Sequence, residues 1–155
     1  MPQGRLRGWE GPGVASRVLL IEDEANIAEA IRFLLGRDGH EVTWSADGAD
    51  LGRLLASGRP DLVILDLMLP GKSGLEILAA LKSDAETRDI PVMMLSAKGQ
   101  GRDREAAEQA GAQEFMSKPF ANGEMRDRVR QLIAAATGAA TGAATGAGIG
   151  AGGNR

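Results

Sequence analysis

Short, entirely apolar runs alternate along this chain with segments of helical periodicity, and this alternation limits the possible folds more than any other feature. Three such runs are VLLI (18–21), LVIL (62–65) and PVMML (91–95). A strand that is apolar throughout is typical of a parallel sheet covered by helices on both faces. EVTWS (41–45) and EFMS (114–117) complete five expected strands, each followed by apolar residues at helical spacing.

Five strand–helix repeats predict an α/β domain of the doubly wound kind. The crossover between two parallel strands is right-handed, so the helices are distributed over both faces of the sheet. Five repeats are too few for an eight-fold barrel. We therefore expect a flavodoxin-like (βα)5 fold with a five-stranded parallel sheet in the order 2-1-3-4-5. Its switch point would lie between the first and third strands.

The two ends of the chain differ in composition from this domain. Residues 1–16 are rich in Gly and Pro and their few apolar side chains are scattered, which predicts a flexible N-terminal extension. Residues 137–155 read TGAATGAATGAGIGAGGNR and contain one large apolar residue. So little burial does not offset the entropy of ordering, and we expect a disordered Gly/Ala/Thr tail. The sequence thus predicts one domain, over residues 17–136, with no second domain after it.

Composition argues against several classes of protein. The formal net charge is −3 and the chain has no cysteine. Nucleic-acid binding needs a basic face, and disulfides or cysteine-based metal sites need cysteine. The apolar runs are far shorter than a membrane span, and no apolar signal segment follows Arg5 and Arg7. We expect a cytoplasmic protein whose partners include neither nucleic acid nor a membrane.

Polar side chains stand at the ends of four of the five expected strands. They are Glu22 and Asp23 after the first, Asp66 after the third, Ser96 after the fourth and Lys118 after the fifth. The ligand crevice of such a sheet lies at the carboxyl ends of its strands, so these groups should converge. Clustered carboxylates repel each other unless a cation lies among them, and oxygen ligands with room for water suit Mg²⁺. With an ammonium and a hydroxyl group, the set is suited to phosphoryl transfer.

Four stretches of the sequence together resemble a known family. They are LLIEDE (19–24), DLVILDLMLPGKSG (61–74), MLSAKGQ (94–100) and GAQEFMSKPF (111–120). In this order and at these spacings they are similar to two-component response-regulator receiver domains, across roughly residues 17–136. Each stretch alone is a weak motif, and the four in order are highly specific.

The resemblance implies a role for each acidic residue at the strand ends. Asp66 would be the phosphoacceptor, which attacks a phosphohistidine on a sensor kinase. Asp23, Asp66 and the main-chain carbonyl of Met68 would bind Mg²⁺, and Glu22 would contribute through a water molecule. The metal-ligand set would therefore consist of oxygen atoms only.

The resemblance also implies how phosphorylation is sensed. Lys118 would hold a phosphoryl oxygen, and the bond between Lys118 and Pro119 is usually cis in the family. Ser96 would turn toward the acyl phosphate and Phe115 would turn inward with it, so these two residues would form the switch. His40, the only histidine, is interpreted as structural.

The function implied is that of a stand-alone response regulator. It would accept a phosphoryl group from a sensor histidine kinase or a histidine phosphotransfer protein and signal through phosphorylation-dependent contact with a downstream protein, which the sequence does not identify. It would not be an enzyme, beyond catalysing its own phosphorylation and dephosphorylation. One alternative is a phosphorelay intermediate that passes the phosphoryl group to another histidine. A phosphatase of the haloacid-dehalogenase kind is disfavoured, because it needs a carboxylate at the position of Met68, and a DNA-binding regulator is disfavoured for want of an output domain.

The sequence also predicts how long the phosphorylated state persists. Met68 and Lys98 follow Asp66 and Ser96 by two positions each, and we expect them to govern access of water to the acyl phosphate. Met68 is apolar and Lys98 offers no carboxylate. We therefore predict a phosphate lifetime of minutes or longer.

Overall fold

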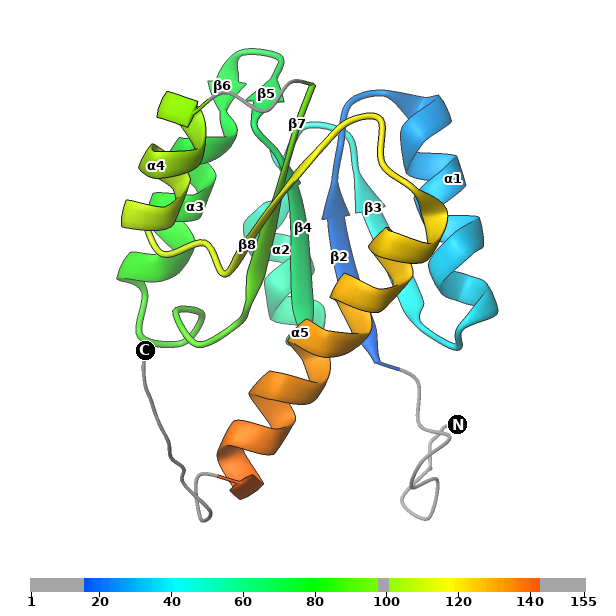
Figure 1. Cartoon of the computed structure of the whole chain (residues 1–155). Coiled ribbons are helices and arrows are strands. Elements are labelled where there is room, and N and C mark those ends of the chain that lie inside the picture. The colour runs from blue at the N-terminus through cyan, green and yellow to red at the C-terminus, as the bar shows by residue number, and fades with distance from the viewer. Residues whose placement is uncertain (1–15, 98–100, 143–155) are drawn as a thin grey trace.

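The computed structural model describes residues 16–97 and 101–142, with side chains as far as residue 136. Five parallel strands form one sheet in the order β3-β2-β4-β7-β8 (Figure 1). They are β2 (Arg17–Ile21), β3 (Glu41–Ser45), β4 (Leu62–Asp66), β7 (Val92–Ser96) and β8 (Glu114–Ser117). Numbered among these strands alone, the order is 2-1-3-4-5. The predicted flavodoxin-like (βα)5 fold is confirmed.

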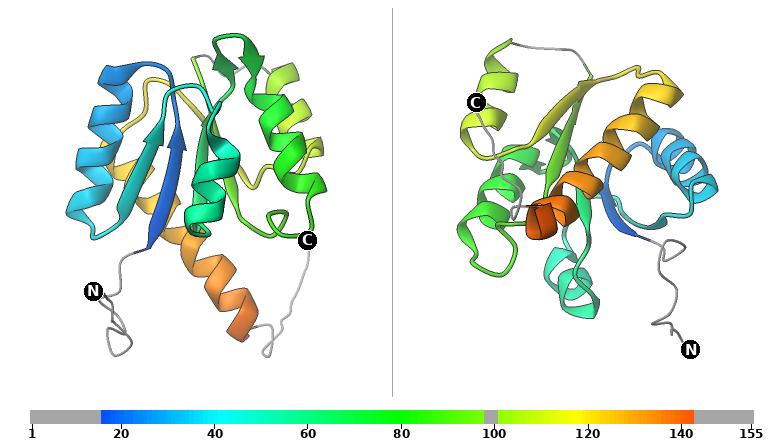
Figure 2. Two further views of the ribbon diagram at one scale, coloured as in Figure 1. Left: turned by 180° about the vertical axis from the view of Figure 1, so that it is seen from behind. Right: turned by 60° about the horizontal axis from the view of Figure 1, so that its bottom comes forward.

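Helices cover both faces of this sheet. Two of them, α1 (Ala25–Arg37) and α5 (Asn122–Gly142), lie on one face. The other face is covered by α2 (Leu51–Ser57), α3 (Gly74–Ser83) and α4 (Gly101–Gln109), as the views from behind and below show (Figure 2). The three layers are those of a doubly wound domain.

Alternation of side chains along each strand divides the core into two halves. In β2, Val18 and Leu20 pack with the apolar stripe of α1, whereas Leu19 and Ile21 face the side of α3. Every residue of β4 is buried, because this strand lies at the centre of the sheet with helices on both sides. Burial on both faces explains why the sequence of the central strands is apolar throughout.

The C-terminal helix extends further than the sequence predicted. Residues 137–142, expected to belong to a disordered tail, form the last part of α5, so the helix continues past residue 136. A helix that is already formed propagates at one hydrogen bond per residue, so α5 can continue beyond its last apolar residue even through glycine and threonine. The rest of the predicted tail, residues 143–155, and residues 1–15 of the predicted extension lie outside the described residues.

A small antiparallel hairpin follows the central strand. Its strands are β5 (Met68–Leu69) and β6 (Lys72–Ser73), and Gly71 adopts a φ of +73° between them. The Oγ atom of Ser73 then accepts a hydrogen bond from the N–H of Leu75 and caps α3. This hairpin was not predicted from the sequence. No helix in the described part of the chain combines the length and the apolar composition needed to cross a membrane.

Candidate functional site

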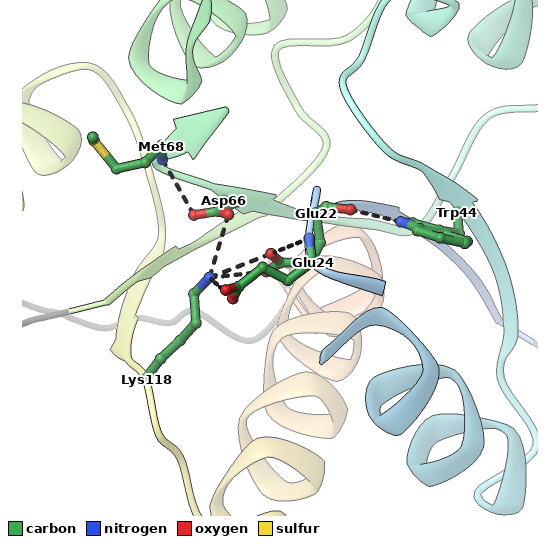
Figure 3. Close-up of polar contacts among 6 residues, drawn as sticks. All are labelled: Glu22, Glu24, Trp44, Asp66, Met68 and Lys118. Carbon is green, nitrogen blue, oxygen red and sulfur yellow. Dashed lines mark hydrogen bonds and ion pairs between the residues drawn. The ribbon is translucent and has the colours of Figure 1, made fainter. Parts of the chain in front are cut away.

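The carboxyl ends of the strands bring the predicted residues to one edge of the sheet. Asp66 is the last residue of β4, Glu22 directly follows β2, and Lys118 directly follows β8. Their side chains point toward one another in Figure 3. Strands β2 and β4 are neighbours, so the Glu22 and Asp66 carboxylates meet at the switch point of the sheet, as predicted.

Lys118 connects the acidic groups. Its Nζ atom lies 3.1 Å from Oε1 of Glu22 and 3.3 Å from Oδ2 of Asp66. Burial by itself lowers the pKa of Lys118, but the hydrogen bonds and negative charges of Glu22 and Asp66 outweigh this effect and raise the pKa. The lysine therefore stays charged, next to the oxygen atoms that a phosphoryl group would join.

The two carboxylates in contact with Lys118 are almost completely enclosed. Glu22 is 0% and Asp66 2% exposed. Burial raises the pKa of Glu22 to about 7, against the hydrogen bond from the Glu24 N–H, and the charge of Asp66 contributes to the rise. Burial also raises the pKa of Asp66, although Lys118 and the N–H of Met68, 3.2 Å from Oδ1, favour its ionised form. A single lysine does not fully compensate the cost of keeping this pair ionised.

The arrangement of the carboxylates fits a divalent cation. Glu22, Asp23 and Asp66 each offer one oxygen atom, and these atoms all lie within 4.8 Å of one another. Asp23 is exposed, which leaves one side of the group accessible to water. Oxygen ligands with water on one side are the environment that Mg²⁺ prefers. The predicted ligands Asp23 and Asp66 are thus brought together, while the main-chain carbonyl of Met68 and the water-mediated role of Glu22 stay predictions.

The two predicted switch residues lie on the neighbouring strands β7 and β8. Ser96 ends β7, is 3% exposed, and accepts a hydrogen bond at its main-chain carbonyl from the N–H of Lys118 (2.6 Å). Phe115 in β8 is 5% exposed, with the guanidinium of Arg104 located 5.6 Å from its ring centroid. The ring is therefore turned into the protein. The bond between Lys118 and Pro119 is cis, as expected.

Three further residues, which were not identified from the sequence, contribute to the site. Glu24 places Oε1 3.6 Å from Nζ of Lys118. Trp44 donates a hydrogen bond from Nε1 to the main-chain oxygen of Glu22 (2.7 Å). Gly74 lies so close to the backbone of β4 that a Cβ atom there would be 2.2 Å from the carbonyl oxygen of Asp66. Glu24 and Gly74 belong to the stretches EDE (22–24) and GKSG (71–74), which lie within the motifs of the resemblance. No sequence feature pointed to Trp44. Lys98 lies outside the described residues.

Comparison with known proteins agrees with this geometry. The family model described as the response regulator receiver domain matches residues 18–130. The chain is 40% identical over 120 residues to the phosphate regulon transcriptional regulatory protein PhoB of Klebsiella pneumoniae, covering 77% of this chain and 52% of that protein. The chain thus spans about half the length of the curated relatives it matches.

Two solved structures are similar in both fold and sequence. A putative response regulator of Chloroflexus aurantiacus superimposes with a TM-score of 0.74 at 29% identity, covering 77% of this chain and 98% of that one. The receiver domain of a sensor histidine kinase of Pseudomonas aeruginosa superimposes with a TM-score of 0.70 at 28% identity, with the same coverage. That structure has a magnesium ion coordinated in its active site cleft.

The family model matches most of the chain. The sheet order agrees with it, and so does the grouping of three carboxylates and a lysine at the carboxyl edge of the sheet. This chain belongs to the response regulator receiver domain family.

Proposed function

We propose that the protein acts as a stand-alone response regulator in the cytoplasm, which takes a phosphoryl group from a histidine onto Asp66 and signals through contact with another protein. The observation that carries the proposal is the position of Lys118, whose Nζ atom lies 3.3 Å from Asp66 beside three convergent carboxylates. A buried carboxylate next to an ammonium group at a strand end is arranged for chemistry rather than for stability.

The proposed reaction is a direct transfer between two side chains. An oxygen of Asp66 attacks the phosphorus of a phosphohistidine, a phosphorus–oxygen bond forms, and the phosphorus–nitrogen bond breaks. The electron pair of that bond returns to the imidazole. Lys118 neutralises charge on the transferred group at the atoms where it develops. A magnesium ion, when bound by Asp23, Asp66 and the Met68 carbonyl with Glu22 through water, would supply the remaining positive charge.

The signal would arise from a shift between two arrangements of the switch residues. An acyl phosphate adds about −1.5 to −2 charges and strong hydrogen-bond acceptors to the edge of the sheet. An arrangement with the Ser96 hydroxyl and Phe115 turned in binds that group better, so its population rises. The downstream protein would then read the surface formed by α4, β8 and α5.

A phosphorelay intermediate is the second candidate. It is supported by the sequence similarity to receiver domains of sensor histidine kinases, at 29% and 28% identity. Transfer of the phosphoryl group from Asp66 to a histidine phosphotransfer protein would favour this function. A phosphorylated protein that gives up its phosphoryl group only to water would favour the stand-alone regulator.

Incubation with acetyl phosphate and Mg²⁺, followed by electrophoresis on a phosphate-affinity gel, tests the proposal. We expect a retarded band for the wild type that disappears in EDTA and in Asp66→Ala. Asp89→Asn, which alters an exposed aspartate in the loop before β7, is the matched control and should behave like the wild type. A wild-type protein that is not retarded, also after incubation with a panel of histidine kinases, would overturn the proposed function.

A further inference from the structure

Trp44 holds the peptide group that joins two of the acidic residues. Its indole Nε1–H donates to the main-chain oxygen of Glu22 at 2.7 Å. That oxygen belongs to the peptide unit between Glu22 and Asp23. The indole therefore fixes the orientation of the peptide plane that precedes the Cα atom of Asp23. Figure 3 shows the carbonyl of Glu22 pointing to Trp44 while its side chain points to Lys118.

The same segment is held at two other points. The N–H of Glu22 donates to the main-chain oxygen of Ser45 at 3.1 Å, which extends the ladder between β2 and β3 beyond Ile21. The N–H of Glu24 donates to Oε2 of Glu22 at 3.1 Å. Together with the indole, these bonds leave the backbone from Glu22 to Glu24 little freedom, although Asp23 itself is exposed to solvent.

The location of Trp44 makes it suitable for this role. It lies on β3, the edge strand of the sheet, and is half-buried against the core on the side of α1 and α5. Packing restricts the ring, so its single N–H donor is held in one direction, toward the Glu22 carbonyl.

We propose that Trp44 is a positioning residue for the metal site: through the Glu22 carbonyl it holds the Asp23 carboxylate where it meets those of Glu22 and Asp66. The inference rests on the proposed function, because it assumes that these carboxylates bind Mg²⁺. A group that orients metal ligands without touching the ion typically contributes severalfold or more to metal affinity. The role is distinct from catalysis, since the indole contacts no reacting atom.

Isothermal titration of the full chain with Mg²⁺ tests the inference, using Trp44→Phe to remove the donor while keeping an aromatic ring. We expect the Kd for Mg²⁺ to rise roughly tenfold, whereas phosphorylation at saturating Mg²⁺ should still reach the wild-type level. Val42→Ala is the matched control, because Val42 lies two residues earlier on the same face of β3 and packs on the same core. It should leave the Kd unchanged within about twofold, since its effect is on packing alone.

Fluorescence supplies a second readout that does not require a variant of Trp44. In a Trp9→Phe background Trp44 is the only tryptophan, and its emission should change with Mg²⁺ at the midpoint found by calorimetry. This measurement decides the matter if Trp44→Phe does not fold. An emission that stays constant while calorimetry shows saturation would overturn the inference.

The outcomes separate this inference from the proposed function. Wild-type Mg²⁺ affinity in a folded Trp44→Phe protein, or an equal loss in Val42→Ala, would overturn the role of Trp44 and leave the phosphoacceptor site intact. Absence of Mg²⁺ binding in the wild type would overturn the proposed metal site, and the inference with it.

Discussion

Among single residues, Glu22 has the most unusual ionisation. Its side chain is fully buried beside Asp66, and burial raises its pKa to about 7 from an ordinary value of 4.5. Between these values the folded protein binds a proton that the unfolded chain has lost. The stability that this group contributes is therefore fully present below about pH 4.5 and is lost as the pH rises through 7.

Glu22→Gln should remove this dependence. In EDTA, we expect the free energy of unfolding of the wild type to fall relative to that of Glu22→Gln between about pH 5 and pH 8, by on the order of 3 kcal/mol. Urea unfolding at several pH values measures the difference. Glu29→Gln, at an exposed position of α1, is the control and should follow the wild type. Parallel pH curves for the wild type and Glu22→Gln would contradict the assignment.

Gly74 is required by the close approach of two backbone segments. A Cβ atom at this position would lie 2.2 Å from the Asp66 carbonyl oxygen and 2.9 Å from Cα of Leu67. Neither atom belongs to a flexible side chain, so Gly74→Ala has to displace the backbone that carries Asp66, the proposed phosphoacceptor. We expect a loss of about 2–3 kcal/mol in the free energy of unfolding and slower phosphorylation of the folded fraction.

A second glycine provides the comparison for Gly74→Ala. Gly52 lies in α2 and has nothing within 4 Å of an added Cβ atom. Gly52→Ala should be neutral or stabilising by up to about 1 kcal/mol, because alanine is the better helix former. Chemical denaturation of the two variants checks both expectations. Equal stability of Gly74→Ala and the wild type would show that the backbone accommodates the methyl group.

A site residue could be predicted from the sequence when the residues that form its environment are also close to it in the sequence. Asp66 ends an apolar strand, and a carboxylate there is costly without a partner, so its importance was visible directly. The role of Lys118 could be predicted only from the motif that contains it, GAQEFMSKPF (111–120). Trp44 was not predictable, because its contact with Glu22 depends on the register between β2 and β3, in which Leu20 pairs with Trp44.

Among the elements, α4 is attached to the sheet by few apolar contacts. Ala107 is its only buried residue among those described. The guanidinium of Arg104 covers the ring of Phe115 in β8 and also pairs with Glu108 at 3.4 Å. A cation over an aromatic ring at a surface contributes about 0.5–1 kcal/mol. The contact thus links the position of α4 to the inward orientation of Phe115.

Removal of the Arg104 side chain should loosen this helix. In Arg104→Ala, we expect the amide hydrogens of α4 to exchange roughly three- to fivefold faster than in the wild type, which corresponds to about 1 kcal/mol. Hydrogen-exchange mass spectrometry resolves this segment. Glu108→Ala is the matched control, because it removes the ion pair but leaves the ring covered. If both variants accelerate exchange equally, the contact with Phe115 does not hold the helix.

The elements themselves were predictable where burial dictates the sequence. Three of the five strands followed from apolar runs of strand length, because a strand covered on both faces has no exposed position. The end of α5 was not predictable in this way, since residues 137–142 (TGAATG) carry no apolar stripe and include two glycines, yet continue a helix that is already formed. The β5–β6 hairpin was also missed, because strands as short as Met68–Leu69 and Lys72–Ser73 have no periodicity to detect.

For the molecule as a whole, stability and chemistry are located in different places. The two halves of the core lie on the faces of the sheet, whereas the three carboxylates and Lys118 occupy one edge. A change at the edge can therefore alter which arrangement of α4 and β8 is favoured without dismantling the core. Under the proposed function, how long such a change persists depends on access of water to the acyl phosphate on Asp66.

Under the proposed function, we expect the residues around that edge to set the lifetime of the phosphorylated state. Asp66 is 2% exposed, whereas the Met68 side chain, two residues later, is 71% exposed. An apolar side chain at this position offers no group to orient an attacking water, and we expect the phosphorylated wild type to persist for minutes or longer at neutral pH with Mg²⁺. Met68→Ala removes most of the side chain expected to limit access of water, so it should shorten the half-life roughly fivefold, equivalent to about 1 kcal/mol in the barrier.

Phe33→Ala is the matched control for this measurement. Phe33 is 69% exposed, on α1, and its removal should leave the half-life unchanged. The decay of phosphoprotein on phosphate-affinity gels, after acetyl phosphate is removed, gives the rates. Loss of the phosphoryl group within seconds in the wild type would show that the apolar Met68 does not protect the acyl phosphate. Equal shortening in both variants would assign the effect to the loss of an exposed apolar side chain in general, whereas shortening in Met68→Ala alone locates control of the signal's duration beside Asp66.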